Sequence, residues 1–158
     1  MKMMQERINI KTLEPKAYRG MFALDEYVRN SQIDPAYREL IKIRASQING
    51  CAYCIQMHTT AARKAGENEQ RLYALSAWWE SPLFSEEERA LLKLTEEVTL
   101  ISEGGVSDET YERALQYFDE NVLAQIIMQI VTINAWNRIA VSTHMVYSYY
   151  RSHEPSRL

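Results

Sequence analysis

The segment from residue 39 to 58, ELIKIRASQINGCAYCIQMH, constrains the fold of this chain more than any other stretch. Its first part is rich in strong helix formers and runs into Asn49-Gly50, where glycine can supply the left-handed conformation that ends a helix. A second helix is predicted to begin at or near Cys51. On one unbroken helix Glu39 and Cys51 would lie about 18 Å apart, whereas a break at Gly50 folds the chain back. The sequence therefore predicts two antiparallel helices in contact.

This helix pair is expected to gather four reactive side chains. Each residue turns a helix by about 100°, so Cys51, Cys54 and His58 fall within an arc of about 60° on the second helix. An antiparallel return brings Glu39 to within about one turn of the level of His58. The chain has 2 cysteines, and both stand in this segment. We therefore predict a buried cluster of Cys51, Cys54, His58 and Glu39.

The predicted cluster suits thiol chemistry. A free cysteine has a pKa of about 8.5, and the unpaired N–H groups of a first helical turn favour its thiolate form. His58 follows Cys54 by four residues, so its imidazole can face that sulfur and take its proton. Glu39 would orient the imidazole. This pairing indicates Cys54 as the attacking sulfur and places Cys51 one turn earlier, where it can resolve a sulfenic acid into a disulfide.

The same residues carry a resemblance to a known family. The spacing E-x11-C-x2-C-x3-H and the run NGCAYCIQMHTTAARKAGE resemble the core motif of the alkylhydroperoxidase D family, within the carboxymuconolactone decarboxylase superfamily. SEEERALLKLTE and INAWNRIAVSTH are more weakly similar, so most of the chain fits the superfamily. The resemblance implies an all-helical protein that reduces hydroperoxides. Cys54 would be peroxidatic and Cys51 resolving, with His58 and Glu39 as a proton relay. Tyr53 stands where some members have a histidine.

The motif is also compatible with other classes of protein. A CxxC with a nearby histidine and glutamate is also the pattern of a zinc-binding or redox-sensing helical protein. A lactone decarboxylase of the wider superfamily would use acid–base groups and would not need a cysteine pair. A dithiol–disulfide oxidoreductase without peroxidase activity would use the same pair. A thioredoxin-like site would require a strand–helix–strand context, which the sequence does not show. We favour a thiol-dependent alkylhydroperoxidase with no cofactor and no bound metal.

Length and composition indicate one globular domain. The 158 residues, 46% hydrophobic and 25% charged, are enough for one core. We predict a single all-α domain over residues 1–158, a bundle of six to seven helices. An N-terminal arm over 1–13, where alternating apolar residues leave open a short strand, precedes the bundle, and a polar tail over 151–158 follows it. The chain has 5 glycines and 4 prolines, which favours long helices with short connections.

Cap and turn signals place several of the helix starts. Asp34-Pro35 is typical of an N-cap followed by the first helical residue, and it opens the helix that carries Glu39. Ser85 with Glu88 three residues later is a capping box. These signals lie just before apolar residues at helical spacing, so a helix is predicted after each of them.

The last predicted helix, from about Glu120 to Tyr150, is the most apolar. Nearly every side of it is apolar between residues 122 and 141, which is typical of a central core helix or of a subunit interface. We expect the CxxC helix to pack against it. Asn134 and Asn137 are polar groups in this apolar helix, so they need hydrogen-bond partners when buried. The family resemblance independently implies a homo-oligomer, a trimer or hexamer.

The remaining features restrict the partners and the compartment. A net charge of −3 gives no electrostatic footprint for nucleic acid, and no apolar run is long enough to cross a membrane. The N-terminus lacks the apolar segment of a secretory signal, and a CxxC pair suits a reducing compartment, so we expect a cytoplasmic protein. The expected partners are a small-molecule hydroperoxide and a dithiol or thioredoxin-like reductant.

Overall fold

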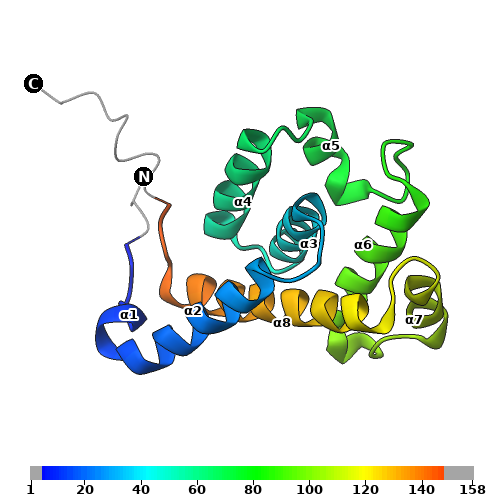
Figure 1. The fold of residues 1–158 in the computed structure, drawn as a ribbon. Helices are drawn as coiled ribbons and strands as arrows, with labels where there is room; N and C mark the ends of the chain where they lie inside the picture. Colours follow the sequence, from blue (N-terminus) through cyan, green and yellow to red (C-terminus); the bar gives the residue numbers. More distant parts are fainter. Residues whose placement is uncertain (1–4, 148–158) are drawn as a thin grey trace, which may run out of the picture.

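The chain folds into a bundle of α-helices joined by short turns (Figure 1). The computed structural model describes residues 5–147, and these residues contain no β-strand. The all-α prediction is therefore confirmed. Two 310 turns, Leu75–Ala77 and Ile101–Glu103, follow α5 and α6. The helices in chain order are α1 (Ile10–Leu13), α2 (Pro15–Arg29), α3 (Pro35–Ile48), α4 (Ala52–Lys64), α5 (Glu69–Ala74), α6 (Glu86–Thr99), α7 (Asp108–Leu115) and α8 (Glu120–Thr143).

Side-chain caps fix the helix starts that the sequence predicts. Asp34 caps α3, since its Oδ1 accepts a hydrogen bond from the N–H of Ala36 at 2.7 Å. Ser85 and Glu88 form the predicted capping box at the start of α6, where each side chain accepts from the backbone N–H of the other. Each such cap satisfies N–H groups that have no partner within the helix and contributes about 1 kcal/mol.

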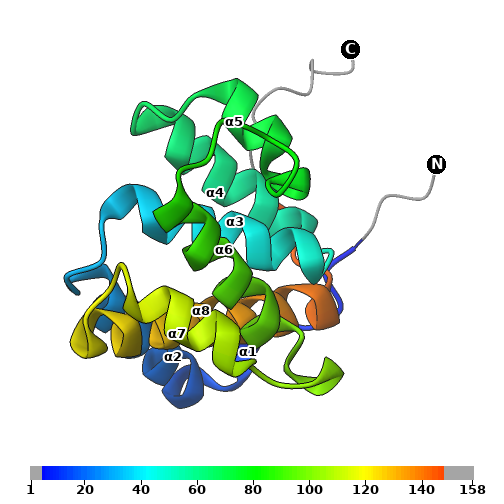
Figure 2. The same ribbon diagram turned by 90° about the vertical axis from the view of Figure 1, so that its right-hand side faces the viewer.

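Helix α3 lies at the centre of the bundle and packs against α4, α6 and α8 (Figures 1 and 2). Its Leu40, Ile41 and Ile43 are fully buried, and Ile41 belongs to the same apolar cluster as Leu91 of α6 and Ile130 of α8. Burying one such side chain contributes about 1.5–3 kcal/mol to stability. The helix that carries Glu39 is thereby held on several sides.

A buried amide network joins the end of α3 to the middle of α8. The Nδ2 of Asn49 donates to the Oδ1 atoms of Asn134 and Asn137, at 3.0 and 2.9 Å. Asn137 in turn donates to Ser46 Oγ at 3.0 Å, and Asn134 donates to Thr99 Oγ1 at 3.0 Å. The two asparagines of α8 that the sequence analysis identifies thus find their partners within the core. The network also fixes where the turn between α3 and α4 lies.

Helix α8 ends earlier than predicted. Its last residue is Thr143, whereas the apolar pattern indicated Tyr150. His144 adopts a left-handed conformation with φ 56°, and the N–H of Met145 turns back to the carbonyl of Ala140 at 3.0 Å. This backbone turn closes the helix without glycine or proline. Residues 148–158, which include the predicted tail, lie outside the described part of the chain.

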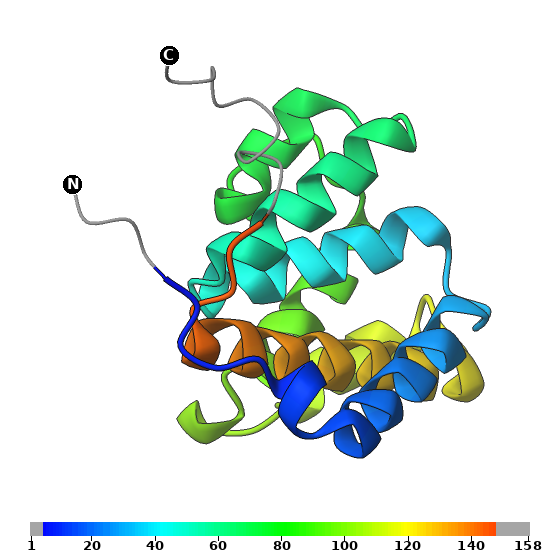
Figure 3. The same cartoon turned by 90° about the vertical axis from the view of Figure 1, so that its left-hand side faces the viewer.

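The predicted N-terminal arm contains a short helix in place of the short strand. Asn9 caps α1 by accepting the N–H of Thr12 at 3.0 Å. Ahead of that helix, the N–H of Arg7 donates to the carbonyl of Thr143 at 2.8 Å, so the arm is attached to the end of α8. Helix α2 then runs back along α8 (Figure 3). Among the described helices none is long and apolar enough to span a lipid bilayer.

Candidate active site

The turn between α3 and α4 brings both cysteines to the start of α4. Gly50 has φ 64°, the left-handed conformation that the sequence predicts for it. Cys51 follows as the N-cap of α4, and its N–H donates to the carbonyl of Ser46 at 2.9 Å. The Sγ of Cys51 accepts from the N–H of Cys54 at 3.3 Å. The positive end of the α4 dipole therefore lies at the sulfur atoms, where it favours a thiolate.

Cys51 and Cys54 are joined as a disulfide, with Cα atoms 5.4 Å apart. Both side chains are buried, at 1% and 2% exposure. Their surroundings differ: Cys54 lines a cavity, whereas Cys51 does not. Cys51 packs with Ala140 of α8 in a small apolar cluster. Only the sulfur of Cys54 is therefore open to a molecule that enters this cavity.

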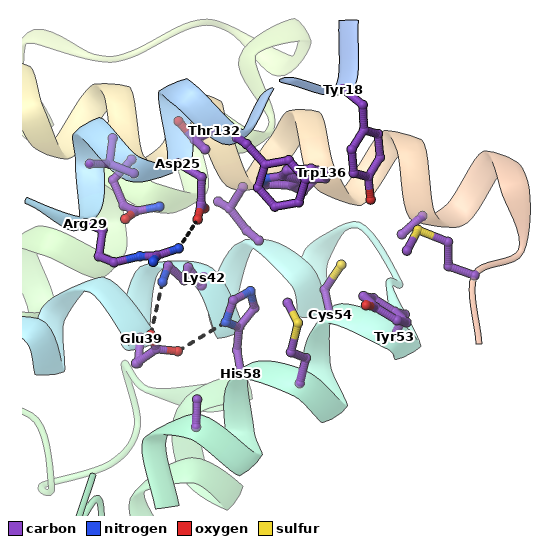
Figure 4. A pocket seen from close by; sticks show the side chains of 18 residues that line it. Tyr18, Asp25, Arg29, Glu39, Lys42, Tyr53, Cys54, His58, Thr132 and Trp136 are labelled. Atoms are coloured by element: carbon purple, nitrogen blue, oxygen red, sulfur yellow. Dashed lines mark hydrogen bonds and ion pairs between the residues drawn. The ribbon is translucent and has the colours of Figure 1, made fainter. Parts of the chain in front are cut away.

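The cavity has a volume of about 410 Å³ and lies between α2, α3, α4 and α8 (Figure 4). This volume falls within the range of small-molecule sites, roughly 300–1,000 Å³. Aromatic residues from α2 and α8 form one wall, since Trp136 packs edge-on against Tyr18 and Phe22 at 5.2 and 5.7 Å between ring centroids. An organic molecule of moderate size would be surrounded by apolar side chains beside Cys54.

His58 and Glu39 line the same cavity and bind each other. The Nδ1 of His58 lies 3.2 Å from the Oε2 of Glu39, across the α3–α4 pair (Figure 4). On the other side of the carboxylate, Lys42 Nζ donates to Oε1 at 3.0 Å. When Nδ1 carries the hydrogen that Glu39 accepts, Nε2 is the nitrogen left to take a proton. Of the four residues that the sequence indicates, Cys54, His58 and Glu39 thus line one cavity, and Cys51 is bonded to Cys54 behind it.

The surroundings of Glu39 keep its carboxylate ionised. Burial by itself raises the pKa of this carboxyl, because it disfavours the charged form. The hydrogen bond from His58 and the positive charge of Lys42 outweigh that effect, so the pKa of Glu39 is lowered from its ordinary value of 4.5. At neutral pH the carboxylate is available to orient the imidazole and to stabilise its protonated form.

Several cavity residues have no counterpart in the sequence prediction. Lys42 follows Glu39 by three residues on a helix, a spacing that brings two side chains together and that is a usable signal. Asp25 and Arg29 of α2 line the cavity and form an ion pair of 2.9 Å. They are four residues apart, a spacing that also brings two side chains together on a helix. Trp136 gives no such local signal, because the packing of α8 against α3 and α4 brings it to the cavity.

The described residues contain no group of three or more histidine, cysteine, aspartate or glutamate side chains arranged to hold a metal ion. Both cysteines of the motif are bonded to each other. His58 and Glu39 face each other across the helix pair. In this structure the four side chains of the motif thus form a disulfide and an imidazole–carboxylate pair.

The family model described as "Carboxymuconolactone decarboxylase family" matches residues 15–97, which include the whole motif. The chain belongs to this family, and its helical fold is of the alkylhydroperoxidase D type. It is 45% identical over 139 residues to the uncharacterized protein YdfG of Bacillus subtilis (strain 168), covering 88% of this chain and 95% of that protein.

Solved structures support the same assignment of the fold. A protein of unknown function from Agrobacterium tumefaciens (ATU0492), with a suggested role as the antioxidant defence protein AhpD, has a TM-score of 0.89 and 40% identity, covering 90% of this chain and 98% of that one. The debrominase Bmp8 has a TM-score of 0.77 and 18% identity, covering 87% of this chain and 74% of its own. At that identity the likeness to Bmp8 concerns the fold alone.

Proposed function

We propose that this protein is a thiol-dependent hydroperoxide reductase in which Cys54 attacks the peroxide. One observation carries the proposal. Of the two bonded cysteines, Cys54 alone lines the cavity, and the linked pair of His58 and Glu39 lines the same cavity. A nucleophile, a base and a group that orients the base are the recurring parts of such sites.

The proposed cycle has three balanced steps. The Cys54 thiolate attacks the outer oxygen of a hydroperoxide, ROOH, and the O–O bond breaks, which gives Cys54 sulfenic acid and the alcohol ROH once the leaving oxygen gains a proton. The thiol of Cys51 then displaces water from the sulfenic acid, and the disulfide forms. An external dithiol reduces this disulfide by exchange and leaves as its own disulfide. The structure corresponds to the oxidised end of this cycle.

The protons follow the His58–Glu39 pair in this proposal. Nε2 of His58 accepts the proton of the Cys54 thiol and returns it to the leaving alkoxide, as a general base and then a general acid. Glu39 receives the hydrogen bond from Nδ1 and so keeps the imidazole in the useful tautomer. Lys42 holds the other oxygen of Glu39, which limits rotation of the carboxylate.

The reductant and the compartment are part of the proposal. A pair that must be reduced in every turnover suits the reducing cytoplasm, where disulfides are usually catalytic and transient. The reductant is a dithiol or a thioredoxin-like protein. Both sulfurs are buried, so its attacking thiol either enters the cavity or reaches the disulfide after the first turn of α4 opens locally.

Thiol titration and trapping test this function. One equivalent of an organic hydroperoxide should remove two free thiols from the reduced protein and produce one alcohol. Cys54→Ser should abolish peroxide consumption, while Cys51→Ser should leave a sulfenic acid that dimedone traps on Cys54. A sulfenic acid trapped on Cys51 in Cys54→Ser would reverse the assigned roles. Disulfide exchange with dithiols but no reaction with any peroxide would indicate the non-peroxidase oxidoreductase instead.

A further inference from the structure

The cavity wall contains a buried side-chain amide with no hydrogen-bond partner. Gln129 of α8 is 1% exposed and lines the cavity. Neither its Nε2 nor its Oε1 has a partner, and within residues 5–147 no other buried side-chain nitrogen or oxygen is in this condition. By contrast, Gln125, one turn earlier, accepts the N–H of Gln32 at 2.9 Å. An unpaired buried amide is destabilising, so its presence at a cavity needs an explanation.

Gln129 lies at the opposite end of the cavity from the reactive sulfur. Gln129, Trp136 and Ala140 line the cavity along one face of α8, and Ala140 packs against the cysteines. Gln129 and Ala140 are eleven residues apart, which is about 16 Å along the helix. Figure 4 shows the same polarity, with Arg29 and Lys42 toward one end and Cys54 toward the other. The cavity is therefore long. Cys54 and His58 lie toward one end, and the other, polar end holds Gln129 with the ion pair of Asp25 and Arg29.

Charge at the polar end is already balanced. Arg29 is paired with Asp25 at 2.9 Å, and Lys42 is paired with Glu39 at 3.0 Å. These formal charges cancel, so no unpaired cation is available to hold a carboxylate or a phosphate. The amide of Gln129 offers one acceptor and two donor hydrogens. Its natural complement is a neutral group that both donates and accepts, such as a carboxamide or a hydroxyl.

We propose that Gln129 is the specificity-determining residue of this cavity and that the substrates are elongated organic hydroperoxides with a neutral hydrogen-bonding group at the far end. The hydroperoxide meets Cys54, the apolar body lies along Trp136, and the distal group binds the amide of Gln129. That the ligand is a hydroperoxide rests on the function proposed above. That its distal group is neutral and binds Gln129 rests only on the side chains that line the cavity.

Binding of the unreactive alcohols tests the recognition without any thiol chemistry. Three alcohols of equal chain length, ending in a carboxamide, a methyl group or a carboxylate, would be titrated into the oxidised protein by calorimetry. We expect the carboxamide to bind about tenfold more tightly than the other two, because a site with unpaired polar groups discriminates against ligands that leave them unpaired. In Gln129→Leu the three affinities should become equal to within about threefold.

Gln125→Leu is the matched control, since it makes the same change on the same helix outside the cavity, and it should keep the tenfold preference. Equal affinities in the wild type, a preference that survives Gln129→Leu, or tighter binding of the carboxylate would each overturn the proposal. These outcomes do not depend on peroxidase activity. If the carboxamide is preferred but none of the matching hydroperoxides oxidises the thiols, the recognition stands and the proposed function fails.

Thermal unfolding supplies a second readout. Gln129→Leu removes two unpaired polar atoms from a buried site and should raise the melting temperature of the protein without ligand. Gln125→Leu removes a hydrogen bond and should lower it. A lower melting temperature for Gln129→Leu would show that the amide is paired within the protein, which would remove the premise of the proposal.

Discussion

The Nδ1 of His58 and the Oε2 of Glu39 lie 3.2 Å apart although 19 positions of sequence separate them. The turn at Gly50 makes this possible, because it reverses the chain between α3 and α4. The carboxylate approaches from the central helix of the bundle, and the imidazole comes from the helix that carries Cys54. The proposed relay thus lies across α3 and α4, which have the most extensive contact of any helix pair within residues 5–147.

Removing the imidazole should slow the reaction in a way that depends on pH. His58→Ala is expected to lower the rate of Cys54 oxidation by about 10²–10⁴-fold near neutral pH, the usual contribution of a general base. The loss should shrink at high pH, where the solvent ionises the thiol without help. Stopped-flow measurement of the rate across pH checks this.

Gln56→Ala is the control for that experiment, because Gln56 lies on the same helix and does not line the cavity. It should leave the rate and its pH profile close to those of the wild type. A loss in His58→Ala that stayed constant from neutral to high pH would indicate that His58 only supports the structure.

The lowered pKa of Glu39 predicts how stability changes with acid. The folded-state pKa lies below the ordinary 4.5, so the unfolded state binds a proton first as the pH falls. The contribution of Glu39 is therefore fully present above about 4.5 and is lost as the pH falls through the lower, folded value. Glu39→Gln should reduce the loss of stability that occurs as the pH falls below about 4.5.

Urea unfolding at several pH values measures this effect. Glu112→Gln, at an exposed position of α7, controls for the removal of one negative charge. It should keep the acid dependence of the wild type. An unchanged acid dependence in Glu39→Gln would mean that the ion pair with Lys42 and the bond to His58 do not stabilise the carboxylate.

The sequence predicts the α3–α4 pair well because its signals are local. Asp34-Pro35 starts one helix, Gly50 ends it, and the spacing of four residues puts Cys54 and His58 on one face. The composition of the cavity was not predictable in this way. The sequence predicts that the CxxC helix packs against the last helix, and α4 does contact α8. It does not predict which side chain of α8, here Trp136, faces the cavity that Cys54 lines. Periodicity identifies an apolar face but does not identify which helix will cover it.

The end of α8 was not predictable for a related reason. Apolar residues continue at helical spacing from Thr143 to Tyr150, and no glycine or proline stands between these two positions. The helix stops because His144 takes a left-handed conformation, which few non-glycine residues adopt. The sequence does not predict the N-terminal helix α1, because a helix of 4 residues is too short to show a helical period. Both differences between prediction and structure concern where helices begin and end, and neither changes the fold.

Two glycine substitutions test the turn that carries the site. Gly50 has φ 64°, and no atom lies within 4 Å of the place that a Cβ would take, so Gly50→Ala should be destabilising through backbone strain alone, by about 1–2 kcal/mol. Gly20 lies within α2 with equally open space, and Gly20→Ala should stabilise by about 0.5–1 kcal/mol. Urea unfolding compares the two variants. Equal effects of the same sign would contradict the role of Gly50 as a helix end.

The outer surfaces of α2 and α8 bear on assembly. Most large apolar residues of α8 pack in the core of the same chain. The helix therefore exposes less apolar surface to solvent than its sequence indicates. Two apolar side chains of α8 are exposed, Val131 at 43% and Val141 at 45%. Two aromatic side chains of α2 are also exposed, Phe22 at 49% and Tyr27 at 52%. Where such residues form a contiguous apolar patch, the patch is typical of a surface that binds another protein.

We propose that these surfaces join copies of the chain into the trimer or hexamer that the family resemblance implies. Light scattering behind a sizing column should then show an oligomer at micromolar concentration. Val131→Arg should shift it toward the monomer, because a charge buried without a partner opposes association. Leu83→Arg, an equally exposed apolar position ahead of α6, should not shift it. A wild-type protein that stays monomeric, or an oligomer that tolerates Val131→Arg as well as it tolerates Leu83→Arg, would leave α8 as a core helix whose outer side faces water.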